Sequence, residues 1–437
     1  MKFYNREEEC NILLENEKQS SSSAVFTVMT GRRRIGKTSL ILHALADKPF
    51  AYLFVSNDSE AVLCGKFQQV ITEQLGINVY GSMTRFRDIF ELLMKESQKR
   101  QFTVVIDEFQ SLMRVNAAIF SEIQDLWDRY HATSHINLIA CGSIQSLMKR
   151  IFERKGEPLY GRPTSKFYLR PFKVEVLKQI LADNYPGYSN EDLLCLYMIT
   201  GGVAKYVELL MDAHCFTRTQ MLDYVCRPDS YFLTEGYDIL NQEFSNESSV
   251  YFSILQLVAN GLTRRSEIDG AIQKETGTYL LNLEQNFKLL KCVKPILAKP
   301  NSKTSAYEIS DPFLRFWFRF ICPYQSLIEL RQLGLLRSNI DKHYEQFSGH
   351  TLEQYFRAGA MESGKFTQVG RWWDRKGENE IDMIALNEFD HTGVIAEIKR
   401  NRSKINLNVL QRKILALPDP AFRKFNFTTL GLSMDDM

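Results

Sequence analysis

The stretch GRRRIGKTS, from Gly31 to Ser39, holds the residues whose chemistry is the most direct to infer. It fits the pattern G-x-x-x-x-G-K-[ST], with Gly31, Gly36, Lys37 and Thr38 at the fixed positions. Glycines let backbone N–H groups wrap around a phosphate chain, the lysine reaches the β- and γ-phosphates, and the hydroxyl ligates Mg²⁺. We therefore expect ATP and Mg²⁺ to bind at Gly31, Arg32, Arg33, Arg34, Ile35, Gly36, Lys37, Thr38 and Ser39.

Two later apolar runs end in polar residues that suit the same chemistry. TVVIDEF ends a strand with Asp107, which is expected to hold Mg²⁺ through water, and Glu108, which is expected to polarise the attacking water. INLIACGS ends with Ser143, which either contacts the γ-phosphate or orients that water, or is only a turn residue. The residue types alone leave these alternatives for Ser143 open.

A second set of charged residues lies near the end of the chain, in EIDMIALNEFDHTGVIAEIKR. Residues two apart on a strand share a face, so Glu397 and Lys399 project together, and a hairpin would bring Asp382 alongside them. Carboxylate pairs bind Mg²⁺ or Mn²⁺, which can activate water at a phosphate ester, and a lysine can neutralise the same charge. Glu353, in TLEQYF upstream, is the matching helical carboxylate. The alternative is two strands with ordinary polar faces.

The elements around the first site alternate between strands and helices. Apolar runs predict strands at AVFTVMT, PFAYLFVS, FTVVID and INLIACGS, and helical patterns cover residues 6–19, SLILHALA, 60–75, 84–100 and 114–130. Such alternation is typical of a parallel sheet with helices on both faces. The first part of the chain is therefore predicted to be an α/β domain whose strand ends carry the site.

The rest of the chain is predicted to contain three further parts. Helical patterns dominate from Phe172 to Phe244. Three helices, SSVYFSILQLVANG, RRSEIDGAI and TGTYLLNLEQNFKLLKCV, then precede a hairpin, PILAKPNSKTSAYEIS, in the order of a winged helix. From about Ser326 the order is helix, strand, strand, helix. DPFLRFWFRF, between these parts, has aromatic residues at helical spacing that indicate core packing.

The predicted winged helix has two possible roles. One is DNA binding, for which it offers a modest set of basic residues: Arg264, Arg265, Lys274, Lys288 and Lys291, with Lys299 and Lys303 near the hairpin tip. The other is a spacer or docking role towards a protein.

Bulk composition excludes several classes of protein. The chain has 437 residues, 44% hydrophobic and 24% charged, with a net charge of +2, so any surface for nucleic acid must be local. Its eight cysteines include no C-x-x-C pair and indicate reduced thiols, the charged N-terminus is no signal peptide, and no stretch reaches the length of a membrane helix. We therefore expect a cytoplasmic protein without membrane insertion.

The first part of the chain resembles an AAA+-type ATPase core, with phosphate loop, metal strand and sensor strand in sequence. The resemblance implies that FYNREEECNILL packs over the adenine through Phe3, Asn5 and Arg6, and that Arg162, in YGRPTSKFYLRPF, contacts nucleotide in cis or from a neighbour. From residues alone, Arg162 reads equally well as a surface arginine.

Nearly the whole chain resembles the prokaryotic, archaeal-type AAA+ ATPases that carry a C-terminal nuclease-like domain. The matching motifs are IDEFQSL, LYGRPTSKFYLRPF, ITGGVAKY, YEISDPFLRFWFRF and EIDMIAL…AEIKR. The last one resembles the PD-(D/E)-x-K nuclease superfamily, with Asp382, Glu397 and Lys399 as its signature and Ile381 where a proline often stands.

This resemblance implies an α/β fold in four parts. These are an AAA+ core at 1–171, a helical lid at 172–244, a winged helix at 245–325 and a nuclease-like domain at 326–437. The expected function is a Mg²⁺-dependent ATPase whose nucleotide state controls a C-terminal domain that binds or cleaves DNA or RNA. Two alternatives remain open: a nucleotide-gated switch whose inactive nuclease fold docks a protein partner, and an ATP-regulated DNA-binding protein that acts through the winged helix.

Overall fold

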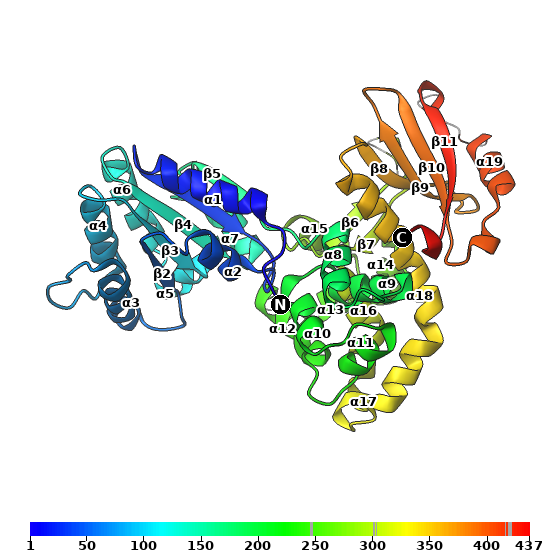
Figure 1. The fold of residues 1–437 in the computed structure, drawn as a ribbon, viewed down its shortest axis with the longest axis horizontal. Coiled ribbons are helices and arrows are strands. Elements are labelled where there is room, and N and C mark those ends of the chain that lie inside the picture. The colour runs from blue at the N-terminus through cyan, green and yellow to red at the C-terminus, as the bar shows by residue number, and fades with distance from the viewer. Residues whose placement is uncertain (245–247, 300–301, 303, 416, 418–421) are drawn as a thin grey trace. The chain divides into compact units, whose positions relative to one another are not determined.

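The structure is a computed structural model that describes residues 1–244, 248–299, 302, 304–415, 417 and 422–437 (Figure 1). The chain forms two compact units. One is Asn5–Arg170, and the other joins Met1–Tyr4 to Pro171–Met437. Each unit has its own core and is described by itself.

The unit Asn5–Arg170 alternates strands and helices, as the sequence predicts. Its strands are β1 (Val25–Thr30), β2 (Phe50–Phe54), β3 (Phe102–Asp107), β4 (Ile136–Gly142) and β5 (Ser165–Tyr168). Its helices are α1 (Glu7–Gln19), α2 (Lys37–Ala44), α3 (Glu60–Leu75), α4 (Phe86–Glu96), α5 (Leu112–Val115), α6 (Ile119–Tyr130) and α7 (Gln145–Glu153), with a 3-10 turn at Phe109–Ser111.

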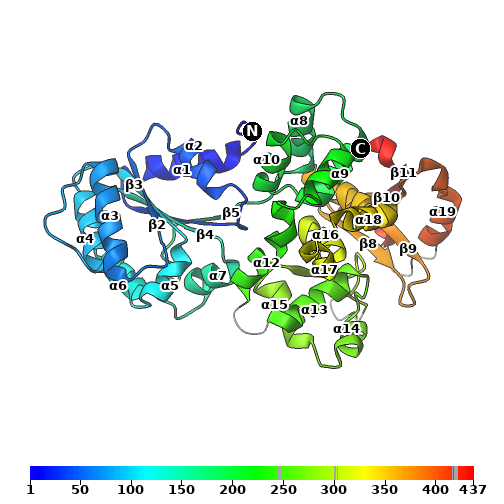
Figure 2. The same ribbon diagram turned by 90° about the horizontal axis from the view of Figure 1, so that it is seen from below.

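The strands of this unit form one parallel sheet in the order β2-β3-β4-β1-β5. Alternate residues of β1 to β4, such as Phe26 and Val104, pack against α3, α4, α6 and α7 in one apolar core. On the other face Thr27 Oγ1 accepts a hydrogen bond from Asn16 Nδ2 of α1, at 3.0 Å. The views in Figures 1 and 2 show helices on both faces. The predicted α/β fold with a parallel central sheet is therefore confirmed.

In the second unit, helices dominate from residue 174 to residue 243. They are α8 (Val174–Asn184), α9 (Asn190–Thr200), α10 (Ala204–Asp212), α11 (Arg218–Val225) and α12 (Tyr231–Glu243). The helix α16 (Pro312–Phe320) packs on α9 and α12 and is capped by Asp311, whose Oδ1 accepts from Leu314 N at 3.1 Å. The aromatic side chains of α16 are buried, so the prediction that they form core is confirmed: Phe313, Phe316, Trp317, Phe318 and Phe320.

Between α12 and α16 lie three helices and a two-stranded antiparallel sheet. The elements are α13 (Ser248–Ala259), α14 (Arg265–Ile272), α15 (Gly277–Gln285), β6 (Leu290–Val293) and β7 (Ala306–Ile309). The prediction of one helix over TGTYLLNLEQNFKLLKCV is wrong. The helix ends at Gln285, Lys288 turns the backbone to a φ of 56°, and LKCV forms the first strand of the hairpin. The predicted tip, with Lys303, lies partly outside the described residues.

The C-terminal part of this unit is a mixed sheet packed on a long helix. After the 3-10 turn Cys322–Tyr324 come α17 (Gln325–Glu329) and α18 (Leu333–Glu362); then follow β8 (Gln368–Trp373), β9 (Glu380–Asn387), β10 (Thr392–Ile398), α19 (Leu407–Leu415) and β11 (Asn426–Leu432). Short 3-10 turns also occur at Arg402–Lys404, Phe422–Lys424 and Met434–Asp436. The strand order is β11-β10-β9-β8; β10 and β11 are parallel, and the β10–β9 and β9–β8 pairs of this sheet are antiparallel.

The predicted order of this part, helix-strand-strand-helix, is incomplete. It misses β8, whose pairing with β9 shifts register between Gly370 and Trp372, and β11, which alternates weakly between exposed and half-buried residues. Neither strand has the continuous apolar run that marks a buried strand in a sequence.

In the described part of the chain, none of the helices combines the length and apolar character that a membrane span requires.

Candidate functional site

The phosphate loop connects β1 to α2. Gly36 precedes the helix with a φ of 99°, a left-handed conformation that favours glycine. A Cβ on Gly31 would lie 3.0 Å from the Leu169 carbonyl oxygen, so the backbone there leaves little room for a side chain. Lys37, the first residue of α2, is buried, and its ammonium donates to the carbonyls of Gly31 at 2.8 Å and Arg32 at 3.1 Å. Burial lowers the pKa of Lys37, and the nearby Cys141, Glu108 and Asp107 oppose this shift.

The two residues predicted to hold Mg²⁺ at this loop are joined by a third side chain. Tyr52, on β2, donates its hydroxyl proton to Asp107 Oδ2 at the end of β3. The same hydroxyl lies 3.2 Å from Thr38 Oγ1 in the first turn of α2. Burial makes the largest contribution to a raised pKa of the Tyr52 hydroxyl, and the negative charge of Asp107 raises the pKa further. Thr38 and Asp107 are therefore brought together around the Tyr52 hydroxyl.

The carboxylate of Glu108 is held by two neighbours. Ser143 Oγ lies 3.0 Å from both carboxylate oxygens, and the Gln110 side-chain amide donates to Oε2. The backbone of Glu108 has a φ of 53°, a conformation unusual for a residue with a side chain. The structure therefore brings Ser143 against Glu108, at the carboxyl ends of β3 and β4.

Arg162 and Arg6, two further residues predicted around the nucleotide, are paired within the unit Asn5–Arg170. Arg162 makes a two-pronged ion pair with Asp128 of α6, at 2.9 and 3.3 Å. Arg6 is buried, forms an ion pair with Glu9 at 3.2 Å, and precedes α1, while Asn5 beside it has a φ of 46°. Phe3 belongs to the other compact unit and is 40% exposed. Contact of these residues with nucleotide stays a prediction.

The C-terminal triplet converges as its strand positions predict. The register of β9 and β10 pairs Met383 with Ala396, so Asp382 and Glu397 follow next to each other. The Lys399 ammonium lies 2.9 Å from Asp382 Oδ2 and 3.3 Å from Glu397 Oε1, and both carboxylates are buried. Asp382 Oδ2 also accepts from the Ile398 backbone N–H at 2.8 Å. Lys413 of α19 approaches Glu397 Oε2 at 3.5 Å.

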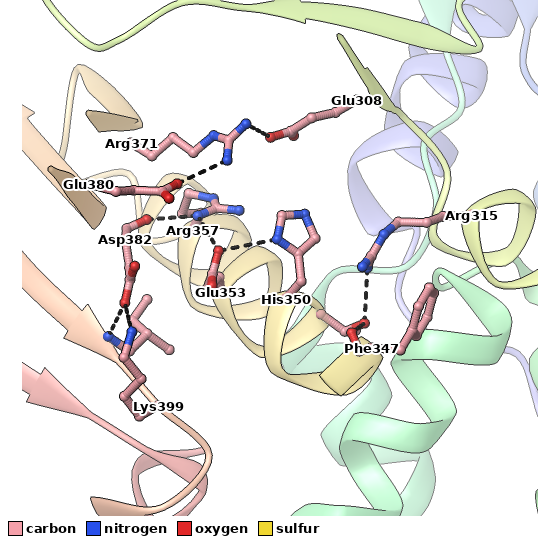
Figure 3. Close-up of polar contacts among 12 residues, drawn as sticks. Glu308, Arg315, Phe347, His350, Glu353, Arg357, Arg371, Glu380, Asp382 and Lys399 are labelled. Carbon is pink, nitrogen blue, oxygen red and sulfur yellow. Dashed lines mark hydrogen bonds and ion pairs between the residues drawn. The ribbon is translucent and has the colours of Figure 1, made fainter. Parts of the chain in front are cut away.

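Glu353, the fourth predicted residue, lies on α18 and is paired elsewhere (Figure 3). His350 Nδ1 lies 3.3 Å from Glu353 Oε2, and Arg357 forms an ion pair with the same oxygen at 3.4 Å. Arg357 also donates to the Asp382 main-chain carbonyl at 2.7 Å and so ties α18 to β9. Among the described residues, no group of three or more His, Cys, Asp or Glu side chains is arranged to hold a metal ion.

The charges in this cluster shift one another's pKa. Burial raises the pKa of Asp382, and the nearby Glu353 raises it further. Burial opposes protonation of Lys399, but Asp382 and Glu397 outweigh it and raise the pKa of the ammonium. In this arrangement Lys399 serves as the internal counter-ion of two carboxylates.

A chain of ion pairs runs from the hairpin to the same sheet. Glu308 on β7 pairs with Lys291 of β6 at 3.1 Å and with Arg371 of β8 at 3.0 Å, and Arg371 pairs with Glu380 of β9 at 3.1 Å (Figure 3). Although burial opposes it, the positive charges of Lys291 and Arg371 lower the pKa of Glu308 to about 2.

Sequence reasoning missed several residues at both sites. Tyr52 and Gln110 contact the predicted residues of the phosphate loop, and Arg357 and Lys413 contact those of the C-terminal cluster. Gln110 follows Glu108 by two residues, a spacing that could have drawn attention to it. Tyr52 carried no such signal, because its partners are 14 and 55 residues away.

The fold and the loop geometry define a P-loop ATPase, and a match to a family model agrees. Residues 3–210 match a family described as an ATPase domain predominantly from Archaea. The solved Walker-type ATPase of Pyrococcus abyssi has a TM-score of 0.55 at 19% identity, over 72% of this chain and 96% of that one. The solved ORC2 protein of Aeropyrum pernix has a TM-score of 0.48 at 16% identity, over 78% of this chain and 96% of that one.

A curated relative extends the match over most of the chain. A protein of Methanocaldococcus jannaschii, described as uncharacterized, is 30% identical over 412 residues, which is 91% of this chain and 87% of that protein. The chain belongs to the same family as this archaeal protein, with an archaeal-type ATPase domain at residues 3–210. Residues 317–410 match a family of archaeal and bacterial proteins of unknown function.

Proposed function

We propose that the chain hydrolyses ATP at the phosphate loop and uses its nucleotide state to control the C-terminal part. The observation that carries the first half is the convergence of Thr38, Asp107 and Glu108 at one edge of the sheet, next to the buried Lys37. A hydroxyl and a carboxylate are the oxygen donors that Mg²⁺ prefers, so these residues fit the cation that accompanies a nucleotide.

In this proposal each side chain has one task. Lys37 exchanges its carbonyl partners for phosphate oxygens, which are better acceptors for an ammonium. Thr38 and Asp107 hold Mg²⁺, which neutralises charge on the phosphates when it is bound. Glu108, oriented by Ser143 and Gln110, polarises the attacking water. Arg162 contributes positive charge after leaving Asp128.

The test uses two substitutions with different expected losses. Lys37→Ala should abolish binding of a fluorescent ATP analogue, because its ammonium is the group expected to reach the β- and γ-phosphates. Glu108→Gln should keep binding and reduce the hydrolysis rate at saturating ATP by roughly 100-fold or more, the usual contribution of a general base. Glu73→Gln, at an exposed position of α3, is the matched control and should behave as wild type. Normal turnover by Glu108→Gln would show that the base is assigned wrongly.

For the C-terminal part we propose a nuclease-like domain, residues 326–437, that binds or cleaves DNA or RNA with Mg²⁺ or Mn²⁺. The contact of Asp382, Glu397 and Lys399 supports it, because paired carboxylates beside a lysine suit phosphodiester chemistry. In this proposal Glu353 completes the site after it separates from His350 and Arg357. Residues 172–244 act as a helical lid and residues 245–325 as a winged helix.

A switch without cleavage is the second candidate. It is favoured by Lys399 and Lys413, whose two ammonium groups balance the charges of Asp382 and Glu397 without a metal ion. In this second candidate function, ATP controls the docking of a protein partner. In a third candidate function, the chain binds DNA through the winged helix alone.

One experiment distinguishes these three candidate functions. Labelled DNA and RNA are incubated with Mn²⁺ and wild type, Asp382→Asn, or the control Glu345→Gln at an exposed position of α18. Cleavage that Asp382→Asn abolishes and Glu345→Gln retains supports the nuclease. Absence of cleavage by wild type supports the switch. DNA binding that is lost in Arg264→Glu, Arg265→Glu but kept in Asp382→Asn assigns binding to the winged helix.

A further inference from the structure

The Tyr52 hydroxyl lies between two residues that come from different elements. Its ring is half-buried on β2, next to β3 in the sheet, and Tyr52 pairs in register with Val105. Its hydroxyl contacts Asp107 Oδ2 at the end of β3 and lies 3.2 Å from Thr38 Oγ1 at the start of α2. The sequence pattern assigns Tyr52 no role in nucleotide binding, although its hydroxyl contacts both predicted Mg²⁺ ligands.

Counting protons fixes the direction of both hydrogen bonds. An ionised carboxylate only accepts, so Tyr52 gives its single hydroxyl proton to Asp107. Tyr52 then has no proton left for Thr38, and the Thr38 hydroxyl must donate to the Tyr52 oxygen. The relay therefore runs from Thr38 through Tyr52 to Asp107.

This direction leaves Thr38 in the state that a metal ligand requires. A hydroxyl binds a cation through a lone pair, so its proton must point elsewhere and find an acceptor. Tyr52 supplies that acceptor and at the same time fixes one oxygen of Asp107, while the Glu108 backbone N–H fixes the other at 2.9 Å. Side chains that orient metal ligands in this way typically change metal affinity by about 10- to 100-fold when they are removed.

We propose that Tyr52 is a positioning residue for the cation of the phosphate loop: its hydroxyl takes the Thr38 proton and holds the Asp107 carboxylate, and so prepares both ligands. This inference rests on the proposed function, in which Thr38 and Asp107 hold Mg²⁺. It adds a residue that acts through these ligands without touching the nucleotide.

The test measures metal binding without turnover. The full chain binds a fluorescent ATP analogue in EDTA, Mg²⁺ is titrated in excess of the chelator, and the fluorescence change gives the half-saturating Mg²⁺ concentration. Tyr52→Phe keeps the ring and removes the hydroxyl, and should raise this concentration by about 10- to 100-fold while leaving binding in EDTA unchanged. Tyr80→Phe is the matched control, since Tyr80 is 88% exposed in the same unit, and should titrate as wild type.

Two further variants test whether the Tyr52→Phe shift arises from loss of the hydroxyl and from its contact with Asp107. Tyr52→Met also lacks the hydroxyl and should shift the titration in the same direction, and binding in EDTA reports an intact loop in each variant. In an Asp107→Asn background the Tyr52→Phe shift should be smaller, because the part that acts through Asp107 is lost while the part that acts through Thr38 remains. A full shift in that background would contradict the relay.

The outcomes separate this inference from the proposed function. If wild type needs Mg²⁺ and Tyr52→Phe titrates like wild type, the inference is wrong and the proposed function stands. If Tyr52→Phe needs less Mg²⁺, the hydroxyl competes with the cation and the inference is again wrong. If nucleotide binding by wild type does not respond to Mg²⁺, both the proposed metal role and this inference fail.

Discussion

At the residue scale, the end of β4 shows how closely the candidate site is packed. A Cβ on Gly142 would lie 2.5 Å from Gln110 Oε1 and even closer to the Met148 sulfur. Gln110 and Ser143, the residue after Gly142, both hold Glu108. The lack of a side chain at Gly142 is therefore part of what orients the Glu108 carboxylate.

Gly142→Ala should destabilise the unit Asn5–Arg170 and slow hydrolysis. Overpacking of this kind typically costs about 1–3 kcal/mol in the free energy of unfolding, because neighbours must leave their preferred rotamers. Displacing Gln110 should also loosen Glu108, so the hydrolysis rate at saturating ATP should fall more than the affinity for ATP. Denaturant unfolding and steady-state kinetics measure the two effects.

Gly65→Ala is the control for this substitution. Gly65 lies inside α3, where an added Cβ meets nothing within 4 Å. Alanine there should stabilise the helix by about 0.5–1 kcal/mol. If Gly142→Ala is as stable and active as Gly65→Ala, the close packing around Gln110 does not constrain the site.

The sequence predicts the chemical role of a residue only where that residue lies within or next to a short motif. Lys37 and Thr38 follow the loop glycines directly, and Asp107 and Glu108 end an apolar strand. Tyr52 became visible only through its contacts, because a tyrosine inside an apolar strand has no pattern of its own.

At the element scale, the hairpin β6-β7 and the strands β8 and β9 are joined by ion pairs through Glu308 and Arg371. Glu308 is buried and its pKa is about 2, well below the 4.5 of an exposed glutamate. A depressed carboxyl pKa contributes stability above the unfolded pKa, and that stability is lost as the pH falls through the folded pKa.

Glu308→Gln should remove this part of the pH dependence. Between about pH 5 and pH 2, wild type should lose about 3 kcal/mol more in free energy of unfolding than the variant, from the size of the shift. Denaturant unfolding followed by tryptophan fluorescence at each pH measures it. Glu345→Gln, at an exposed position of α18, should keep the wild-type slope. Parallel curves for wild type and Glu308→Gln would contradict the role of these ion pairs.

The elements themselves were predictable to different degrees. Strands β1, β3 and β4 are buried on both faces and carry continuous apolar runs, whereas the edge strand β2 is buried only at alternate residues; the sequence predicts all four. The sequence predicts a helix where β6 lies, since LKCV continues the apolar spacing of α15; in the structure α15 ends at Gln285 and the backbone turns at Lys288 before the strand. The strands β8 and β11 lack a clear pattern and were missed.

At the scale of the whole molecule, contacts over long sequence distances define the second compact unit. Trp317 of α16 donates to the Leu233 carbonyl of α12 at 3.2 Å, and Glu362 at the end of α18 accepts from Val174 N at 3.0 Å. Met1–Tyr4 join this unit through ion pairs of the Met1 amino group with Asp212 at 2.8 Å and of Lys2 with Asp183 at 2.7 Å. The division of residues 172–437 into a helical lid, a winged helix and a nuclease-like domain stays a prediction.

The sequence by itself determined the phosphate loop, the strands that end at Asp107 and at Gly142, the parallel α/β class and the convergence of Asp382, Glu397 and Lys399. Each of these depends on short-range spacing and on the alternation of side chains along a strand. Only the tertiary structure decided which side chains complete the sites: Tyr52 between Thr38 and Asp107, Gln110 and Ser143 on Glu108, and Arg357 between Glu353 and β9. The physical reason is that such contacts follow from strand order and helix packing between distant segments, which no local pattern encodes.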